Sequence, residues 1–134
     1  MPTVLDASAL VAFLMREPAA HVVGEAVARG DAQAPTLIGV ETMSAIMRME
    51  RRGVVDAETA HEAAAVARGA RISLVPDREL LARAWTLRHN VTAYDALYVA
   101  LAEHLGCPLM TTDRRLARAV EETIAVTLIP ETAG

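Results

Sequence analysis

Four acidic residues stand in apolar surroundings, where carboxylates are unusual. Asp6 follows the run TVL, and Glu41 is the only charged residue in TLIGVETMSAIM. Asp95 lies within VTAYDALYVALA, and Asp113 follows LMTT. An ionised carboxylate buried without a partner costs several kcal/mol, on the order of the whole stability of a small domain. A partner group or a bound cation must therefore offset the free-energy cost of burying these charges.

Each acid on its own also has an ordinary structural explanation. Asp6 and Asp113 suit the N-caps of helices that would follow them. The segment TAYD fits a capping box, in which Asp95 bonds back to the backbone of Thr92. Glu41 is different, because it lies more than one turn inside its predicted helix, too deep for an N-terminal role.

The joint placement of the four acids favours a shared site. Two follow predicted strands and two lie near the starts of long predicted helices, and these ends meet at one crevice of an open parallel sheet. Two carboxylates about 5 Å apart repel by roughly 3 kcal/mol at an effective dielectric of 20. Such a cluster needs a cation or captured protons. Oxygen ligands without histidine or cysteine favour Mg²⁺ or Mn²⁺, which commonly act on phosphates, so we expect Asp6, Glu41, Asp95 and Asp113 to be metal-binding and catalytic.

Hydroxyl side chains accompany the acids. Thr111, Thr112 and Ser8 could hold a metal-bound water or a phosphate. Ser8 could instead cap a helix, and the threonines could simply suit a strand. We assign a site role to Thr111 only.

Short β-rich runs alternate with helical patterns along the chain, which is typical of an α/β layered fold with a mainly parallel sheet of about four or five strands. The predicted strands are Thr3 to Asp6, Ala32 to Ala34, Ile72 to Val75, Leu109 to Thr111 and Val126 to Ile129.

The helical patterns fall between glycines and prolines, which separate elements. Asp56 and Asp77 are predicted N-caps, and the segment from Gly53 to Gly69 is predicted to form a helical hairpin with the helix before it. The predicted helices run from about Ala9 to Arg16, Ala20 to Arg29, Thr36 to Arg52, Ala57 to Arg68, Arg78 to Arg88, Ala93 to His104 and Arg114 to Glu122.

Composition indicates one soluble domain spanning residues 1–134. The chain has 134 residues, 53% of them hydrophobic, enough for a buried core without a staple. Cys107 is the only cysteine, which excludes an intramolecular disulfide and fits a small buried residue in a reducing cytoplasm. There is no secretory leader pattern and no uncharged run near the ~18 residues of a membrane span, so we expect a cytoplasmic protein that does not enter a membrane.

The net charge of −4 excludes a global basic field for nucleic acid, so any such contact must be local. All 13 basic residues are arginine, which suits bidentate phosphate contacts. They include two groups, each of which is ordinarily a solvated helix face, although the second adjoins the predicted metal site. The groups are Arg48, Arg51 and Arg52, and Arg114, Arg115 and Arg118.

The aromatic and histidine residues show no base-stacking or metal-ligand pattern. We expect the aromatic side chains to pack in the core and the histidines to lie on the surface. These residues are Phe13, Trp85, Tyr94 and Tyr98, and His21, His61, His89 and His104.

Four motifs together resemble the PIN-domain ribonucleases, and most closely the VapC toxins of bacterial VapBC toxin–antitoxin pairs. They are VLDASALVAFL, VETMSAIMR, TAYDALYVALAEHLGCPLMTTDRRLA and the closing VTLIP, and they span almost the whole chain. The resemblance implies a PIN-like three-layer α/β/α sandwich and a Mg²⁺- or Mn²⁺-dependent endoribonuclease that cuts RNA with a metal-activated water.

The resemblance also implies the residue roles and the partners. Asp6 and Asp95 match the main metal ligands, Glu41 and Asp113 match acids that bind through water or hold a second ion, and Thr111 matches the family's hydroxyl residue. The implied partners are RNA, a second copy of the chain in a homodimer, and a VapB-type antitoxin. Its tail is expected over the apolar groove of the first helices, with an arginine reaching the acidic pocket.

Ser44 departs from the family pattern, since many relatives carry asparagine three positions after the acid that matches Glu41. An alternative function is a catalytically idle PIN-like domain that serves as a protein-interaction module, although none of the central acids is missing. A phospho-accepting receiver domain also gathers acids at strand ends. Receiver domains use a lysine near the last strand, however, and this chain contains no lysine, which excludes that alternative.

Overall fold

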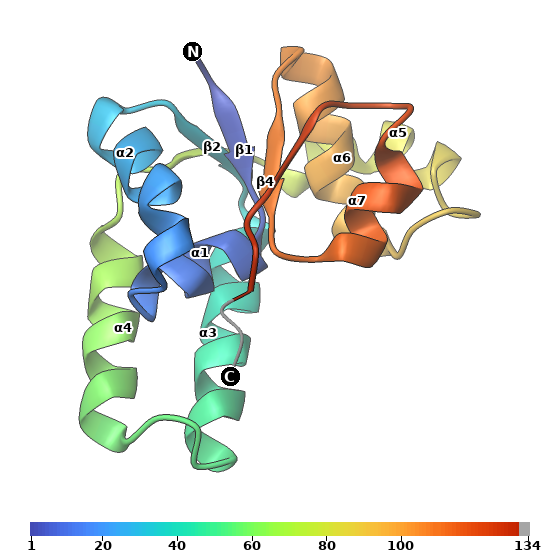
Figure 1. The fold of residues 1–134 in the computed structure, drawn as a ribbon. Helices are drawn as coiled ribbons and strands as arrows, with labels where there is room; N and C mark the ends of the chain where they lie inside the picture. Colours follow the sequence, from blue (N-terminus) through green and yellow to red (C-terminus); the bar gives the residue numbers. More distant parts are fainter. Residues whose placement is uncertain (132–134) are drawn as a thin grey trace.

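The computed structural model describes residues 1–131 and contains five parallel strands in one sheet (Figure 1). Their order is β3-β2-β1-β4-β5, so β1 lies at the centre and pairs with β2 on one side and β4 on the other. The strands are β1 (Thr3–Leu5), β2 (Ala32–Pro35), β3 (Ser73–Val75), β4 (Leu109–Thr111) and β5 (Val126–Leu128). The predicted parallel sheet is confirmed.

The helices form a layer on each face of this sheet. Figure 1 shows α1 to α4 on one side and α5 to α7 on the other. The α-helices are α1 (Ala7–Leu14), α2 (His21–Arg29), α3 (Leu37–Arg51), α4 (Ala57–Gly69), α5 (Leu81–Thr86), α6 (Ala93–Leu105) and α7 (Arg114–Val120), with short 3₁₀ turns η1 (Pro18–Ala20) and η2 (Asp77–Leu80). No helix of the described residues is long and apolar enough to cross a membrane.

Helix α6 forms the centre of the main core. Every residue from Ala96 to Ala102 is buried, and α6 contacts β1, β2 and β4. Because this helix is apolar around its whole circumference, the sheet covers one side and neighbouring helices cover the rest. Its position fixes Asp95, in its first turn, against the carboxyl ends of the central strands.

The helix that follows β2 forms a hairpin with α4, as the sequence predicts. Ile46 of α3 packs with Ala60 and Ala63 of α4 in a small second core. This hairpin extends below the sheet in Figure 1 and carries Glu41 near its start.

Polar caps begin several helices, and one predicted cap is wrong. Asp56 caps α4 by accepting a hydrogen bond of 2.8 Å from the Thr59 N–H, as expected. Asp77 does not cap the turn that follows it. Its carboxylate accepts the N–H of Leu37 at 3.0 Å, and thereby caps α3 from across the sheet edge. The reason is that β2 and β3 are paired, so their carboxyl ends place Asp77 beside the first residues of α3.

The aromatic residues divide between core and surface. Tyr98 is 1% exposed, and Phe13 is partly buried against the core. Trp85 and Tyr94, however, are 67% and 59% exposed, so the prediction of core packing is wrong for these two. Both lie where α5 and the start of α6 leave an apolar face without a covering element. The four histidines are exposed and Cys107 is buried, as predicted.

Candidate active site

Asp6 occupies the turn between β1 and α1, at the carboxyl edge of the sheet. Its side chain is buried, and Oδ1 accepts hydrogen bonds from the Ser8 hydroxyl at 2.6 Å and the Ala9 N–H at 2.9 Å. Asp6 is therefore the N-cap of α1, as its ordinary structural explanation predicts. Burial raises the pKa of the Asp6 carboxyl, and the nearby negative charge of Glu41 adds to this, while the hydroxyls of Ser8 and Thr111 and the Ala9 N–H oppose it.

Ser8 joins the turn after β1 to the turn after β4. Its Oγ lies 3.2 Å from Oγ1 of Thr111 and accepts the Thr112 N–H at 3.0 Å. Thr111 Oγ1 in turn accepts the Asp113 N–H at 3.0 Å. The sequence predicts a site role for Thr111 but not for Ser8, although Ser8 lies only two residues from Asp6.

Asp95 and Asp113 come from the starts of α6 and α7. Asp95 is half-buried, and its backbone N–H donates to Oγ1 of Thr92 at 3.2 Å, which is one of the two hydrogen bonds of a capping box; the predicted return bond from Asp95 to the Thr92 backbone stays a prediction. Burial raises the pKa of Asp95, and the negative charges of Asp6 and Asp113 raise it further. Asp113 is exposed and caps α7 through the N–H groups of Arg115 and Leu116.

Glu41 reaches the same region from the second turn of α3. The buried Tyr98 hydroxyl donates a hydrogen bond of 2.6 Å to its Oε1. Burial, the Glu41 hydrogen bond and the surrounding acids raise the pKa of Tyr98, which stays a neutral donor. From the sequence, Tyr98 is expected only to pack in the core. Tyr98 lies three residues after Asp95, which places both side chains on one face of a helix. This spacing is the sequence signal that could have identified Tyr98 as a site residue.

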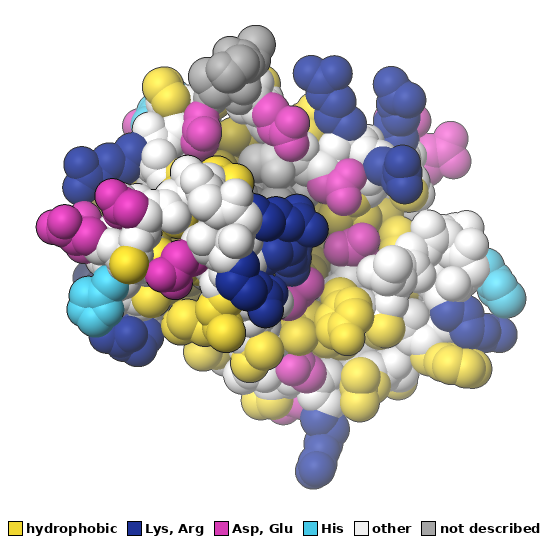
Figure 2. All heavy atoms as spheres, turned by 90° about the horizontal axis from the view of Figure 1, so that it is seen from below, with side chains coloured by type: hydrophobic (Ala, Val, Ile, Leu, Met, Phe, Trp, Pro, Cys, Tyr) yellow, Lys and Arg dark blue, Asp and Glu magenta, His cyan; other side chains and the backbone are white. Residues whose placement is uncertain are grey.

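The four acids form an electrostatically linked series. Asp6 is coupled to Glu41 and to Asp95, and Asp95 is coupled to Asp113. Within residues 1–131, however, no three histidine, cysteine, aspartate or glutamate side chains lie close enough to enclose a metal ion together. Figure 2, which views the molecule from below, shows acidic side chains between groups of basic ones on this face.

Cavities border the acids on both sides. One, of about 540 Å³, is lined by Ser8, Glu41, Thr112 and Arg48. The other, of about 480 Å³, is lined by Asp95 and Asp113 together with arginines of other elements. Ser44, at the position where the family pattern has asparagine, is exposed on α3.

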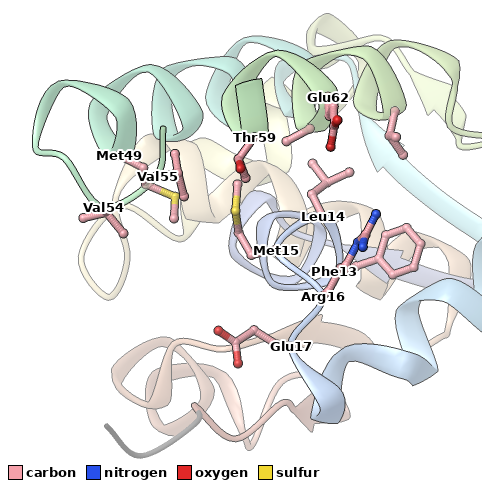
Figure 3. Close-up of a pocket in the computed structure, with 12 residues that line it drawn as sticks. Phe13, Leu14, Met15, Arg16, Glu17, Met49, Val54, Val55, Thr59 and Glu62 are labelled. Atoms are coloured by element: carbon pink, nitrogen blue, oxygen red, sulfur yellow. The ribbon is translucent and has the colours of Figure 1, made fainter. Parts of the chain in front are cut away.

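A third cavity lies away from the acids, between α1 and the α3–α4 hairpin. Figure 3 shows Leu14 and Met15 reaching toward α4, with Phe13 at one end of the cavity and Val54 and Val55 at the other. Its volume is about 620 Å³, and it shares Met15, Glu17 and Met49 with the cavity that contains Glu41. The two cavities are therefore neighbours along α1 and α3.

A family model described as "PIN domain" matches residues 3–122. The chain belongs to the PIN domain family. The matched region contains all four acids, Ser8 and Thr111, so the resemblance noted from the motifs is confirmed at the level of the family.

Curated relatives of this PIN domain are named as ribonucleases. "VapC ribonuclease Mb0985" of Mycobacterium bovis is 34% identical over 127 residues, which are 95% of this chain and 98% of the relative. "Ribonuclease VapC1" of Mycobacterium tuberculosis is 40% identical over 122 residues, 87% of this chain and 89% of the relative.

Two solved structures have the same fold as this PIN domain. PAE2754 from Pyrobaculum aerophilum aligns with a TM-score of 0.69 at 25% identity, over 94% of this chain and 83% of that one. VapBC-5 from Mycobacterium tuberculosis, described as a member of the VapBC family of toxin–antitoxin systems, aligns with a TM-score of 0.53 at 19% identity, over 97% of this chain and 98% of that one. These alignments confirm the PIN-like α/β fold.

Proposed function

We propose that this PIN domain is a Mg²⁺- or Mn²⁺-dependent endoribonuclease and the toxin of a type II toxin–antitoxin pair. The observation that carries the proposal is the coupling of the buried Asp6 to Glu41 and Asp95 at the carboxyl edge of the sheet. The names of the curated relatives, which are 34–40% identical, support RNA as the substrate. We expect the protein to act in the cytoplasm, where it would meet that substrate.

The donor chemistry of the site fits a hard divalent cation. All four candidate ligands are carboxylates. Burial, and to a lesser extent the charges of the neighbouring acids, raise the pKa of Asp6 and Asp95, and a cation would offset both effects. Mg²⁺ keeps several waters and is usually bound through one or two carboxylates, so the absence of a closed group of three among residues 1–131 is compatible with it. Asp6 and Asp95 would be the main ligands, with Glu41 and Asp113 acting through water or on a second ion.

When bound, the cation would supply an activated water and stabilise the charge that develops on the phosphate. The protein's own groups keep the carboxylates in position. Ser8 and the Ala9 N–H hold Asp6, and Tyr98 holds Glu41. Thr111 contributes a hydroxyl close to both Ser8 and Asp6. The carboxylates therefore orient the reacting groups more than they transfer protons.

The test is RNA cleavage by the purified protein with Mg²⁺ or Mn²⁺. Asp95→Asn and a chelator should each abolish cleavage. Asp56→Asn, which changes an exposed capping aspartate on α4, should leave it intact. Cleavage that survives both Asp95→Asn and the chelator would overturn the proposal. No cleavage by the wild-type protein, with partner binding intact, would favour the catalytically idle interaction module.

We propose that the antitoxin occupies the apolar cavity between α1 and α4 (Figure 3). Because this cavity adjoins the one containing Glu41, a bound segment extends toward the acids, where an arginine would satisfy their charge. Val54→Asp, at the cavity, should weaken co-purification with the protein encoded by the neighbouring open reading frame. Val40→Asp, at an equally exposed position of α3 outside the cavity, is the control. Equal retention by both variants would contradict this location.

We propose a homodimer through the apolar face of α5 and α6. Leu81, Trp85 and Tyr94 are more than half exposed there, around a cavity of about 890 Å³. Light scattering after gel filtration should report a dimer for the wild-type protein and a monomer for Trp85→Glu. A monomeric wild-type protein would refute the dimer.

A further inference from the structure

The cavity beside Asp95 and Asp113 combines these two carboxylates with two arginines from different elements. Arg88 comes from the loop between α5 and α6, and Arg115 comes from the first turn of α7. His89 and Asn90 complete the polar wall, in a volume of about 480 Å³. Neither arginine has a role in the catalysis proposed above, although Arg88 also lines the cavity at the proposed dimer face.

Arg88 is held in place by Trp85 of α5. Its guanidinium carbon lies 4.4 Å from the centroid of the Trp85 ring, and Nη1 donates to the Trp85 carbonyl oxygen at 2.9 Å. A stacked guanidinium presents its remaining donors in a fixed plane. Arg88 therefore loses less side-chain entropy on binding a ligand than a free surface arginine would.

The donors of both arginines remain available despite the nearby acids. Within residues 1–131, no ion pair joins Arg88 or Arg115 to a carboxylate, although Asp95 and Asp113 line the same cavity. A guanidinium has five N–H donors, and Arg88 uses one of them on the Trp85 carbonyl. The cavity thus holds cationic donors that are free of ion pairs within residues 1–131 and lie beside the carboxylates.

We propose that this cavity binds a backbone phosphate of the RNA strand adjacent to the phosphate that is cleaved, an inference that rests on the proposed function. The planar donors of an arginine match two oxygens of one phosphate. Asp95 lines this cavity and is within electrostatic reach of Asp6, so a phosphate bound here would place the strand beside the candidate metal ligands. The site would read no base, because its contacts are to the strand's backbone.

The experiment measures the affinity for a fluorescein-labelled single-stranded RNA by anisotropy, in Ca²⁺ and over a range of salt concentrations. Arg88→Gln and Arg115→Gln are compared with Arg68→Gln, which removes an exposed arginine on α4. Each cavity variant should lower affinity about fivefold at 0.1 M salt and reduce the salt slope by about 0.7, the value for one phosphate contact on a single strand. Arg68→Gln should change neither quantity.

Cleavage assays separate this proposal from the function on which it rests. With Mg²⁺, the cavity variants should raise KM while kcat stays near the wild-type value. Wild-type cleavage with unchanged affinity and salt slope in both variants would overturn the cavity proposal and leave the nuclease standing. A wild-type protein that neither binds nor cleaves RNA would overturn both. If the cavity variants lose affinity only for the antitoxin and not for RNA, the cavity proposal is also overturned, because the ligand would then be a protein.

Discussion

The Tyr98 hydroxyl donates a hydrogen bond of 2.6 Å to Glu41, and this bond connects α6 to α3 across the candidate site. Tyr98 is buried, so its position is set by core packing and not by solvent. Asp95, three residues earlier, faces the same region. One helix therefore supplies both a carboxylate and the donor that orients another carboxylate.

Replacing Tyr98 by phenylalanine removes this hydroxyl and keeps the ring. We expect kcat to fall on the order of tenfold, equivalent to about 1.4 kcal/mol, because Glu41 loses a charge-assisted hydrogen bond. Tyr94→Phe changes an exposed tyrosine of the same helix and should have no effect. Matching circular dichroism spectra would show that both variants fold. An unchanged kcat in Tyr98→Phe would show that Glu41 needs no such support.

Asp95→Asn should stabilise the metal-free protein at neutral pH while abolishing cleavage. Burial and the charges of Asp6 and Asp113 raise the pKa of Asp95 above its ordinary value of 3.8. A carboxyl whose pKa is raised on folding makes its full contribution to stability below its ordinary pKa. That contribution is lost as the pH rises through the raised pKa. The variant's advantage should therefore grow between pH 4 and pH 7.

The measurement is thermal unfolding in the presence of a chelator across this pH range. We expect a rise in Tm at pH 7 of roughly 2–4 °C, corresponding to about 0.5–1 kcal/mol of relieved repulsion. A difference between the two proteins that does not vary with pH would mean that the Asp95 charge is not opposed by its surroundings.

Divalent cations should raise the Tm of the wild-type protein. A ligand that binds only the folded state stabilises it by about 2.7 kcal/mol at one hundred times its Kd. Asp6→Asn should abolish the shift produced by Mn²⁺, because it removes a main candidate ligand while an amide can still cap α1. Asp56→Asn is the matched control. Equal shifts in all three proteins would place the cation elsewhere.

The long-range cap of α3 makes a separate prediction about stability. Asp77→Ala should lower the free energy of unfolding by about 1 kcal/mol, because the Leu37 N–H loses its acceptor. Asp77→Asn should retain most of the stability. Glu79→Ala, at an exposed acid of the same turn, serves as the control in urea unfolding. If Asp77→Ala and Glu79→Ala unfold alike, the hydrogen bond to Leu37 contributes little.

Local patterns predicted the elements well, because apolar periodicity and the Pro and Gly positions are properties of short segments. The predicted helix from Arg78 to Arg88 was less accurate, since the chain instead forms η2 and then α5, which ends at Thr86. Contacts between residues far apart in the sequence could not be predicted from local patterns. The link from Asp77 to Leu37 and the Tyr98–Glu41 bond each join residues that come together only in the folded sheet.

The four candidate acids stand out in the sequence because an acid in an apolar segment is costly wherever it lies, so this signal does not depend on tertiary contacts. Exposure was harder to predict. Trp85 and Tyr94 are large apolar residues of the kind that usually pack in a core. Only the fold shows that nothing in residues 1–131 covers them.

The central position of β1 affects when the site forms during synthesis. Asp6 follows β1, but the partner strand β4 comes more than one hundred residues later in the chain, and Asp113 follows β4. A nascent chain still missing β4 and α7 lacks the Thr111 hydroxyl, Asp113 and the partner of Ser8. The candidate site therefore gathers its groups only after β4 and the start of α7 have been synthesised, and a product terminated before them would lack Thr111 and Asp113.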